Sequence, residues 1–202
     1  MTEAEWLTTT DPPAMLEFVR GTASDRKFRL FACGSCRADE LAWGDAESRG
    51  AWTRMEEEVD QLPVAIHRDP FFDDQNGRVE GVRIETAYFA ARETARLLAE
   101  RRGGAFRDFF GSRSRRKALA LIIRDVLGNP FRPVSTDPSW LTPTALLLAQ
   151  GIYADRAFDR LSILADALQD AGCDSADLLN HLRGGGPHVL GCWALDVTLG
   201  KS

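Results

Sequence analysis

Short apolar segments with helix-capping residues at their ends are the feature that most constrains this fold. A capping residue followed by proline precedes two of them, at Asp11-Pro12 and Thr142-Pro143, and glycine ends others at Gly21 and Gly172. A side-chain acceptor at the N-cap satisfies a backbone N–H, and proline at the first helical position loses no hydrogen bond. The chain is therefore predicted to form many short helices rather than a sheet.

The spacing of apolar residues places these helices along most of the chain. Residues three and four apart share one helical face, and this pattern predicts helices at 12–20, 24–43, 45–61, 85–102, around 119–126, and at 143–153, 160–171, 175–183 and 187–199. No fixed repeat period emerges. We predict an all-α, multi-helix orthogonal or helical-hairpin-stacked domain whose core contains Trp6, Phe18, Phe31, Trp140, Leu146, Leu164, Leu168, Trp193 and Leu195.

Length and composition favour a single domain that spans 1–202. The chain has 44% hydrophobic and 27% charged residues, which is typical of globular proteins. The helical pattern lapses at 62–84, where Pro70 and the turn dipeptide Asn76-Gly77 predict one long irregular loop insertion. His67 and the nearby aspartates of that loop match no metal-binding motif and are interpreted as a solvated turn.

The sequence contains no membrane signal. No stretch approaches the roughly 18 to 20 apolar residues that a membrane span needs, and the N-terminus lacks the charged-then-apolar plan of a signal peptide. The four cysteines, Cys33, Cys36, Cys173 and Cys192, are too sparse for a disulfide scaffold. We therefore expect a cytoplasmic protein without a membrane partner, whose cysteines are reduced thiols or metal ligands.

Several short motifs together resemble a known family. They are Glu5-Trp6-Leu7, Ser24-Asp25-Arg26-Lys27, Arg29-Leu30-Phe31-Ala32-Cys33 with Cys36-Arg37, Gly128-Asn129-Pro130-Phe131-Arg132-Pro133, Trp140-Leu141-Thr142, Ala157-Phe158-Asp159-Arg160, Ala171-Gly172-Cys173-Asp174, His188 and Gly191-Cys192-Trp193. The pattern resembles an uncharacterised paralogous family of Gemmata-type planctomycete bacteria, over roughly residues 1–40 and 120–201. The middle of the chain departs from it, and Ser35 stands where relatives carry a second cysteine beside Cys36. No activity is established for that family, so the resemblance implies no mechanism.

Two pairs of metal-type ligands form the sharpest candidate site. Cys33 and Cys36 are three residues apart, and His188 and Cys192 are four apart, so each pair would share a helix face. Two such helices in contact would offer the thiolate and imidazole ligands that zinc prefers. Cys173, predicted near His181, would be a substitute for one member. The alternative is that all of these cysteines belong to the apolar core, since free cysteine is among the most buried residues.

A basic segment at 101–117 is the second candidate site. It carries seven basic residues and one acid, a local charge of +6 in a chain of net charge −5, with three phenylalanines between them. The candidate binding residues are Arg101, Arg102, Phe106, Arg107, Phe109, Phe110, Arg113, Arg115, Arg116 and Lys117. Such a strip on an acidic body would suit a protein partner with an acidic surface, or the phosphates and bases of RNA or DNA. The alternative interpretation is a solvated helix start whose phenylalanines are core.

The motifs present do not specify a reaction. The sequence contains no Walker loop, GxGxxG, GxSxG or HExxH motif. We therefore predict a non-catalytic protein-interaction module, an adaptor or scaffold, that has no cofactor, with a zinc ion at Cys33, Cys36, His188 and Cys192 as the alternative. A nucleic-acid-binding accessory protein that uses 101–117 and a metal-dependent enzyme are the two alternative functions.

Overall fold

The computed structural model describes residues 1–38, 56 and 112–201, and within them the chain is helical and contains no β-strand. The predicted all-α class is confirmed. The predicted loop at 62–84 and the predicted helix at 85–102 lie outside the described residues, and so does the predicted helix at 45–61 except for residue 56. No helix in the described part is long and apolar enough to cross a bilayer.

The first group of helices, here called the N-terminal unit, consists of α1 (Glu3–Thr8), α2 (Pro12–Val19), α3 (Asp25–Ala38) and α6 (Ser112–Leu127). Helix α1 begins with a capping box, in which Thr2 and Glu5 each bond the other's backbone N–H. Asp11 precedes α2 as predicted, yet its side chain makes no capping hydrogen bond. The apolar faces of these helices bury one hydrophobic cluster, which includes Trp6, Leu16, Phe28, Phe31, Ile122, Ile123 and Val126.

The C-terminal unit consists of α7 (Pro143–Asp155), α8 (Leu161–Asp170), α9 (Ala176–Arg183) and α10 (Trp193–Leu199). One short 3₁₀ turn, Pro138–Trp140, precedes α7, and another, Phe158–Arg160, joins α7 to α8. Thr142 and Ser175 cap α7 and α9 through their hydroxyl groups. Helices α7, α8 and α9 pack in sequence around a second hydrophobic cluster, which includes Ala149, Ile152, Leu164, Leu168, Leu178, Leu182, Cys192 and Leu195.

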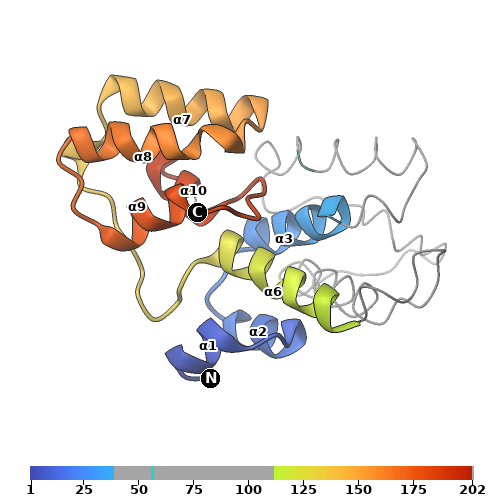
Figure 1. The fold of residues 1–202 in the computed structure, drawn as a ribbon. Coiled ribbons are helices and arrows are strands. Elements are labelled where there is room, and N and C mark those ends of the chain that lie inside the picture. The colour runs from blue at the N-terminus through green and yellow to red at the C-terminus, as the bar shows by residue number, and fades with distance from the viewer. Residues whose placement is uncertain (39–55, 57–111, 202) are drawn as a thin grey trace, which may run out of the picture.

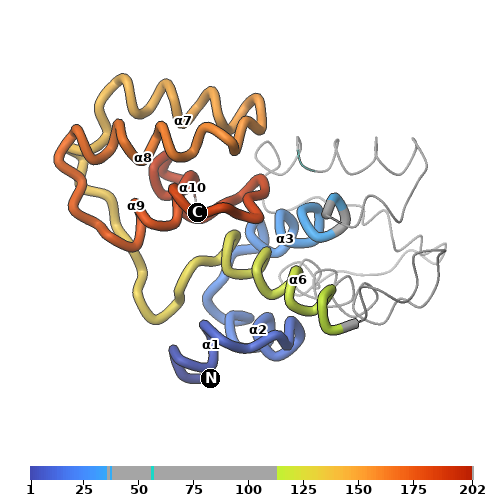
Figure 2. The backbone as a smooth tube through the Cα atoms, in the orientation of Figure 1, coloured from blue at the N-terminus to red at the C-terminus, as the bar shows by residue number. Residues whose placement is uncertain are grey.

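The two units lie side by side (Figure 1), and the backbone tube shows the segment before α10 reaching back toward α3 and α6 (Figure 2). Val189 and Leu190, from that segment, belong to the cluster of the N-terminal unit. Two glycines permit this approach. A Cβ at Gly34 of α3 would lie 3.0 Å from the Val189 side chain, and one at Gly191 would lie 2.6 Å from Leu30. The segment 184–192 is therefore fitted closely against α3.

The structure corrects the predicted final helix. A helix over 187–199 was expected, but α10 begins at Trp193, and residues 187–192 are not helical. Gly191 has a φ of 91°, which a right-handed helix does not contain. The burial of Val189 and Leu190 in the other unit's cluster also outweighs any helical preference of this segment.

The predicted core is right in part. Trp6, Phe31, Leu164, Leu168 and Leu195 are fully buried, as predicted. Trp140, Leu146 and Trp193 are only partly buried, and Phe18 is 38% exposed. Phe18 stacks on Phe131, with ring centroids 5.3 Å apart. Its ring therefore packs against another partly exposed ring at the surface and not within the core.

Candidate metal centre

Asp125 is the centre of a polar cluster at the boundary between the units. It is the one acidic residue in the sequence of α6, and its neighbours Ile122, Ile123 and Val126 are buried. Its position on that apolar face leaves Asp125 only 3% exposed. A buried carboxylate needs partners to offset its loss of hydration, and here they come from the C-terminal unit.

Two histidines and a cysteine surround Asp125. The Nε2 atom of His181, in the last turn of α9, lies 3.0 Å from Asp125 Oδ1 and 3.2 Å from Cys192 Sγ. The Nδ1 atom of His188 lies 2.8 Å from the same carboxylate oxygen and 3.9 Å from the same sulfur. One ligand atom from each of the four residues lies within 4.8 Å of all the others. Four potential ligands from α6, α9 and the segment 184–192 thus converge.

The geometry differs from that of a catalytic triad. In a triad the nucleophile and the acid bond opposite nitrogens of the histidine ring, so that a proton can move between them. In this cluster each imidazole presents a single nitrogen to both the carboxylate and the sulfur. Cys192 is also fully buried, which denies a substrate access to its sulfur. The four groups form a hydrogen-bonded cluster that could hold a metal ion.

Two of the four residues, Asp125 and His188, make a second hydrogen bond through the polar atom that does not contact the other members of the cluster. The second carboxylate oxygen of Asp125, Oδ2, accepts a hydrogen bond of 2.9 Å from the backbone N–H of Val189. The second ring nitrogen of His188, Nε2, lies 3.1 Å from the carbonyl oxygen of Gly184. Histidines that bind metals usually donate their other N–H to a carbonyl or carboxylate, which orients the ring. The outer contacts therefore match those of a metal site.

The pKa shifts in the cluster follow from burial and from the charge of Asp125. Burial opposes ionisation of Asp125, yet hydrogen bonds from His181, His188 and Val189 hold its pKa below its ordinary value. Burial also opposes protonation of His188, but the hydrogen bond and charge of Asp125 prevail and raise the pKa of that imidazole. Burial, followed by the charge of Asp125, raises the pKa of the Cys192 thiol well above its ordinary value. Without a cation, the thiol is therefore neutral.

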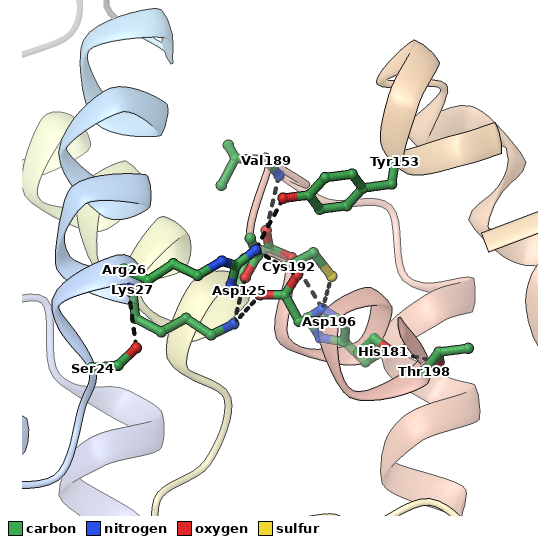
Figure 3. Close-up of polar contacts among 12 residues, drawn as sticks. Ser24, Arg26, Lys27, Asp125, Tyr153, His181, Val189, Cys192, Asp196 and Thr198 are labelled. Carbon is green, nitrogen blue, oxygen red and sulfur yellow. Dashed lines mark hydrogen bonds and ion pairs between the residues drawn. The ribbon is translucent and has the colours of Figure 1, made fainter. Parts of the chain in front are cut away.

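A second buried aspartate lies at the same boundary, as Figure 3 shows. Asp196 of α10 is 1% exposed, and Arg26 of α3 bonds both of its oxygens, at 2.7 and 3.2 Å. Lys27 Nζ lies 2.5 Å from Oδ2 of Asp196 and 2.9 Å from the carbonyl oxygen of Gly191. Arg26 also donates to the hydroxyl of Tyr153 on α7. This carboxylate is therefore paired with an arginine and a lysine.

A third buried carboxylate, Glu56, pairs with arginines of both units. It is 3% exposed and lies 2.6 Å from Arg37 of α3 and 2.9 Å from Arg156, which follows α7. Asp125, Asp196 and Glu56 are the buried acids among the described residues, and all three join one unit to the other. Asp125 differs from the others because its partners are groups that bind metals.

A groove of about 800 Å³ runs along the boundary and reaches the cluster at His181. Lys27, Trp193 and Asp196 line it together with His181. The His181 side chain is 22% exposed, against 9% for His188 and 3% for Asp125. The cluster is therefore approached from solvent on the side of His181.

The structure brings together two of the four predicted ligands. His188 and Cys192 belong to the cluster, but they come from a non-helical segment and do not share a helix face. Cys33 is buried in α3 and is not a member, and the side chain of Cys36 lies outside the described residues. Cys173 is buried in the cluster of the C-terminal unit and is not a member either.

Asp125 was not predicted as a ligand from the sequence, and His181 was named only as a neighbour of Cys173. A signal existed for each. Asp125 is an acid on an otherwise apolar helix face, where a charge is expected only with a partner. His181 stands in the last turn of a helix, before a run of three glycines and His188.

The basic candidate site is described only at its end. Arg113, Arg116 and Lys117 are exposed in the first turns of α6, and Arg115 is partly buried. Arg101, Arg102, Phe106, Arg107, Phe109 and Phe110 lie outside the described residues. The binding surface that these arginines and phenylalanines were predicted to form stays a prediction.

Comparison of this chain with protein-family models, curated proteins and solved structures finds no match. The chemistry of the cluster therefore rests on its own geometry. Four ligand atoms of types that bind metals converge at the boundary of two helical units.

Proposed function

We propose that this chain is a zinc-binding helical module in which one ion, held by Asp125, His181, His188 and Cys192, joins the two units. The observation that carries the proposal is the convergence of four ligand atoms within 4.8 Å. Because the ligands come from three separate segments, an ion bound to all four would fix α9 and the segment 184–192 against α6. Binding energy at such a site is also folding energy.

The mixture of ligand types favours zinc. Zinc binds thiolate, imidazole and carboxylate ligands in tetrahedral geometry, whereas calcium and magnesium take oxygen ligands. Bond lengths of about 2.0 to 2.3 Å place tetrahedral ligand atoms roughly 3.3 to 3.6 Å apart. Asp125 lies 3.0 and 2.8 Å from His181 and His188, Cys192 lies 3.2 and 3.9 Å from the same two rings, and all four atoms lie within 4.8 Å of one another. The ligands would therefore have to shift by up to about 1 Å to bind one ion.

The module is proposed to act through a protein surface rather than through catalysis. Four protein ligands complete a tetrahedron, which is the pattern of structural zinc sites. The exposed residues Arg113, Arg116 and Lys117 of α6 supply a basic surface for an acidic protein partner. A cytoplasmic location, where thiols stay reduced, would keep Cys192 available as a ligand.

Metal content tests the zinc proposal directly. Protein purified without chelator should contain about one zinc per chain by elemental analysis, and chelation should lower its melting temperature. An Asp125→Ala variant should contain none, while Asp177→Ala, at an exposed position on α9, serves as the matched control and should retain it. Wild-type protein that contains no zinc and takes up none when one equivalent is added would refute the proposal.

A further inference from the structure

The four proposed ligands are not equally fixed, and the difference lies at His181. Asp125 is held by Val189, His188 is held by Gly184, and Cys192 is fully buried at the start of α10. In contrast, both hydrogen bonds of His181 within the described part of the chain are made by Nε2, the nitrogen that faces the cluster. Among the residues that the structure describes, its Nδ1 atom therefore has no supporting contact of the kind that orients a ligating histidine.

His181 is also the ligand nearest to solvent. Its side chain is the most exposed of the four, and it lines the boundary groove of about 800 Å³. It stands in the last turn of α9, where the helix ends at Gly184. Residues at a helix end open at a lower free-energy cost than those in a packed interior. A molecule in the groove would therefore meet this ligand first.

The surroundings of His181 are aromatic. Its ring centroid lies 5.0 Å from that of Trp193 at an interplanar angle of 51°, and 5.2 Å from that of His188 at 80°. Aromatic pairs favour tilted and edge-to-face arrangements at these distances. A planar ring in place of His181 would keep both contacts, whereas an aliphatic or purely anionic ligand would lose them.

We infer that the position held by His181 is an exchangeable coordination site, open to the groove, that accepts an aromatic nitrogen donor from outside the chain. The inference rests on the proposed zinc site. Asp125, His188 and Cys192 would form the permanent three-ligand set, and three protein ligands with one exchangeable position are typical of zinc sites that bind a further molecule. In the exchange, the nitrogen lone pair of the incoming ring would form a bond to the metal as the bond from His181 Nε2 broke, with no change of oxidation state.

Cobalt(II) in place of zinc makes the exchange visible, because a thiolate bound to cobalt gives a charge-transfer absorption band and its d–d bands report the coordination geometry. The experiment compares wild type with His181→Ala and His188→Ala, and uses exposed Asn180→Ala on the same helix as the matched control. We expect His181→Ala to bind Co²⁺ more weakly than wild type, because one of the four ligands is lost, and to keep the thiolate band. Added imidazole should then restore wild-type d–d bands in a saturable manner.

The His188→Ala control shows whether rescue by imidazole is specific to the position of His181. His188→Ala should not be restored by imidazole, because its position is enclosed and depends on Gly184. Equal rescue of both variants, or no rescue of His181→Ala, would overturn the inference and leave the zinc proposal standing. Wild-type protein without a thiolate band would overturn both. If circular dichroism shows His181→Ala to be unfolded, the wild-type protein is tested instead. Imidazole should then accelerate zinc transfer from the wild type to a chelator severalfold. An unchanged rate of transfer overturns the inference.

Discussion

Asp125 and Asp196 occupy equivalent situations at the boundary of the two units, yet they are compensated in different ways. Both are almost completely buried, and both receive partners from the opposite unit. Asp196 has an arginine, a lysine and, through that arginine, a tyrosine. Asp125 has two imidazoles, a thiol and a backbone amide.

The comparison separates a structural ion pair from a ligand set. Arginine and protonated lysine are cations with no lone pair to offer a metal, so the Asp196 cluster is complete as it stands. Histidine and cysteine become metal ligands when they are deprotonated, so the Asp125 cluster has a capacity that the other lacks. Replacing Asp196 should then cost the same stability with and without zinc, while replacing Asp125 should cost more stability with zinc than without it.

The largest expected loss in the free energy of unfolding comes from Asp196→Ala. Asp196→Ala leaves Arg26 and Lys27 with buried charges that lack their partner, which typically costs about 3 to 5 kcal/mol. Urea denaturation should show a loss in the free energy of unfolding of this size, equal with zinc and with chelator. Exposed Asp155→Ala is the matched control and should change little. A loss that disappears when zinc is removed would contradict the comparison.

The next effect is the zinc-dependent gain in stability. Zinc at 100 to 1,000 times its dissociation constant should stabilise the folded protein by about 2.7 to 4.1 kcal/mol. The gain should vanish in Asp125→Ala and Cys192→Ala and persist in Cys173→Ala, whose sulfur is also buried in the C-terminal unit. Thermal denaturation with zinc and with chelator measures it. Equal responses of the two cysteine variants would place the metal elsewhere.

The pH dependence should differ between the metal-free and zinc-bound protein. Asp125 has a lowered folded pKa, so its contribution is present above its ordinary value of 3.8 and is lost as pH falls through the folded value. His188 has a raised folded pKa, so its contribution is present below 6.5 and is lost as pH rises through the folded value. Metal-free protein should therefore lose stability above about pH 6.5.

Zinc should act in the opposite direction, because it binds neutral imidazole and thiolate and competes with protons. The stabilisation that zinc provides should grow as pH rises from 6 to 8, and denaturation curves at several pH values would show it. The Asp196→Ala variant should keep this zinc response. A zinc effect independent of pH would mean that no histidine or cysteine proton is released.

The smallest effect on stability is expected at the basic start of α6. Changing Arg113, Arg116 and Lys117 to glutamate should alter the free energy of unfolding by no more than about 0.5 kcal/mol, because these residues are exposed. Acidic side chains near a helix N-terminus also interact favourably with the helix dipole, which offsets part of any loss. The same variant should lose capture of an acidic protein partner. Loss of RNA binding instead would favour the nucleic-acid alternative, and retained capture would place the interface elsewhere.

Local signals predicted most of the described helices, because caps, prolines and glycines act within a few residues. Thr142 and Ser175 start α7 and α9 where expected, and Gly128 follows α6. The final helix was predicted too long because the reason for its late start is not local. Val189 and Leu190 are buried against α3 and α6, and no periodicity within 187–199 reveals that contact.

The candidate site was predictable to a smaller extent. The spacing of His188 and Cys192 drew attention to the right residues, although they come together on a turn and not on a helix face. Asp125 lies 56 residues before His181 in the chain, so only the packing of α6 against the C-terminal unit brings them together. Cys33 and Cys36 had equally suitable spacing, and spacing alone does not say which pairs meet.

X-ray absorption at the zinc edge, on protein with one equivalent of zinc, tests the central claim most directly. The account predicts one sulfur ligand at about 2.3 Å and three nitrogen or oxygen ligands at about 2.0 to 2.1 Å. The Asp196→Ala variant should give the same spectrum, and Cys192→Ala should lose the sulfur. A shell of six oxygen or nitrogen atoms without sulfur in the wild type would contradict the account.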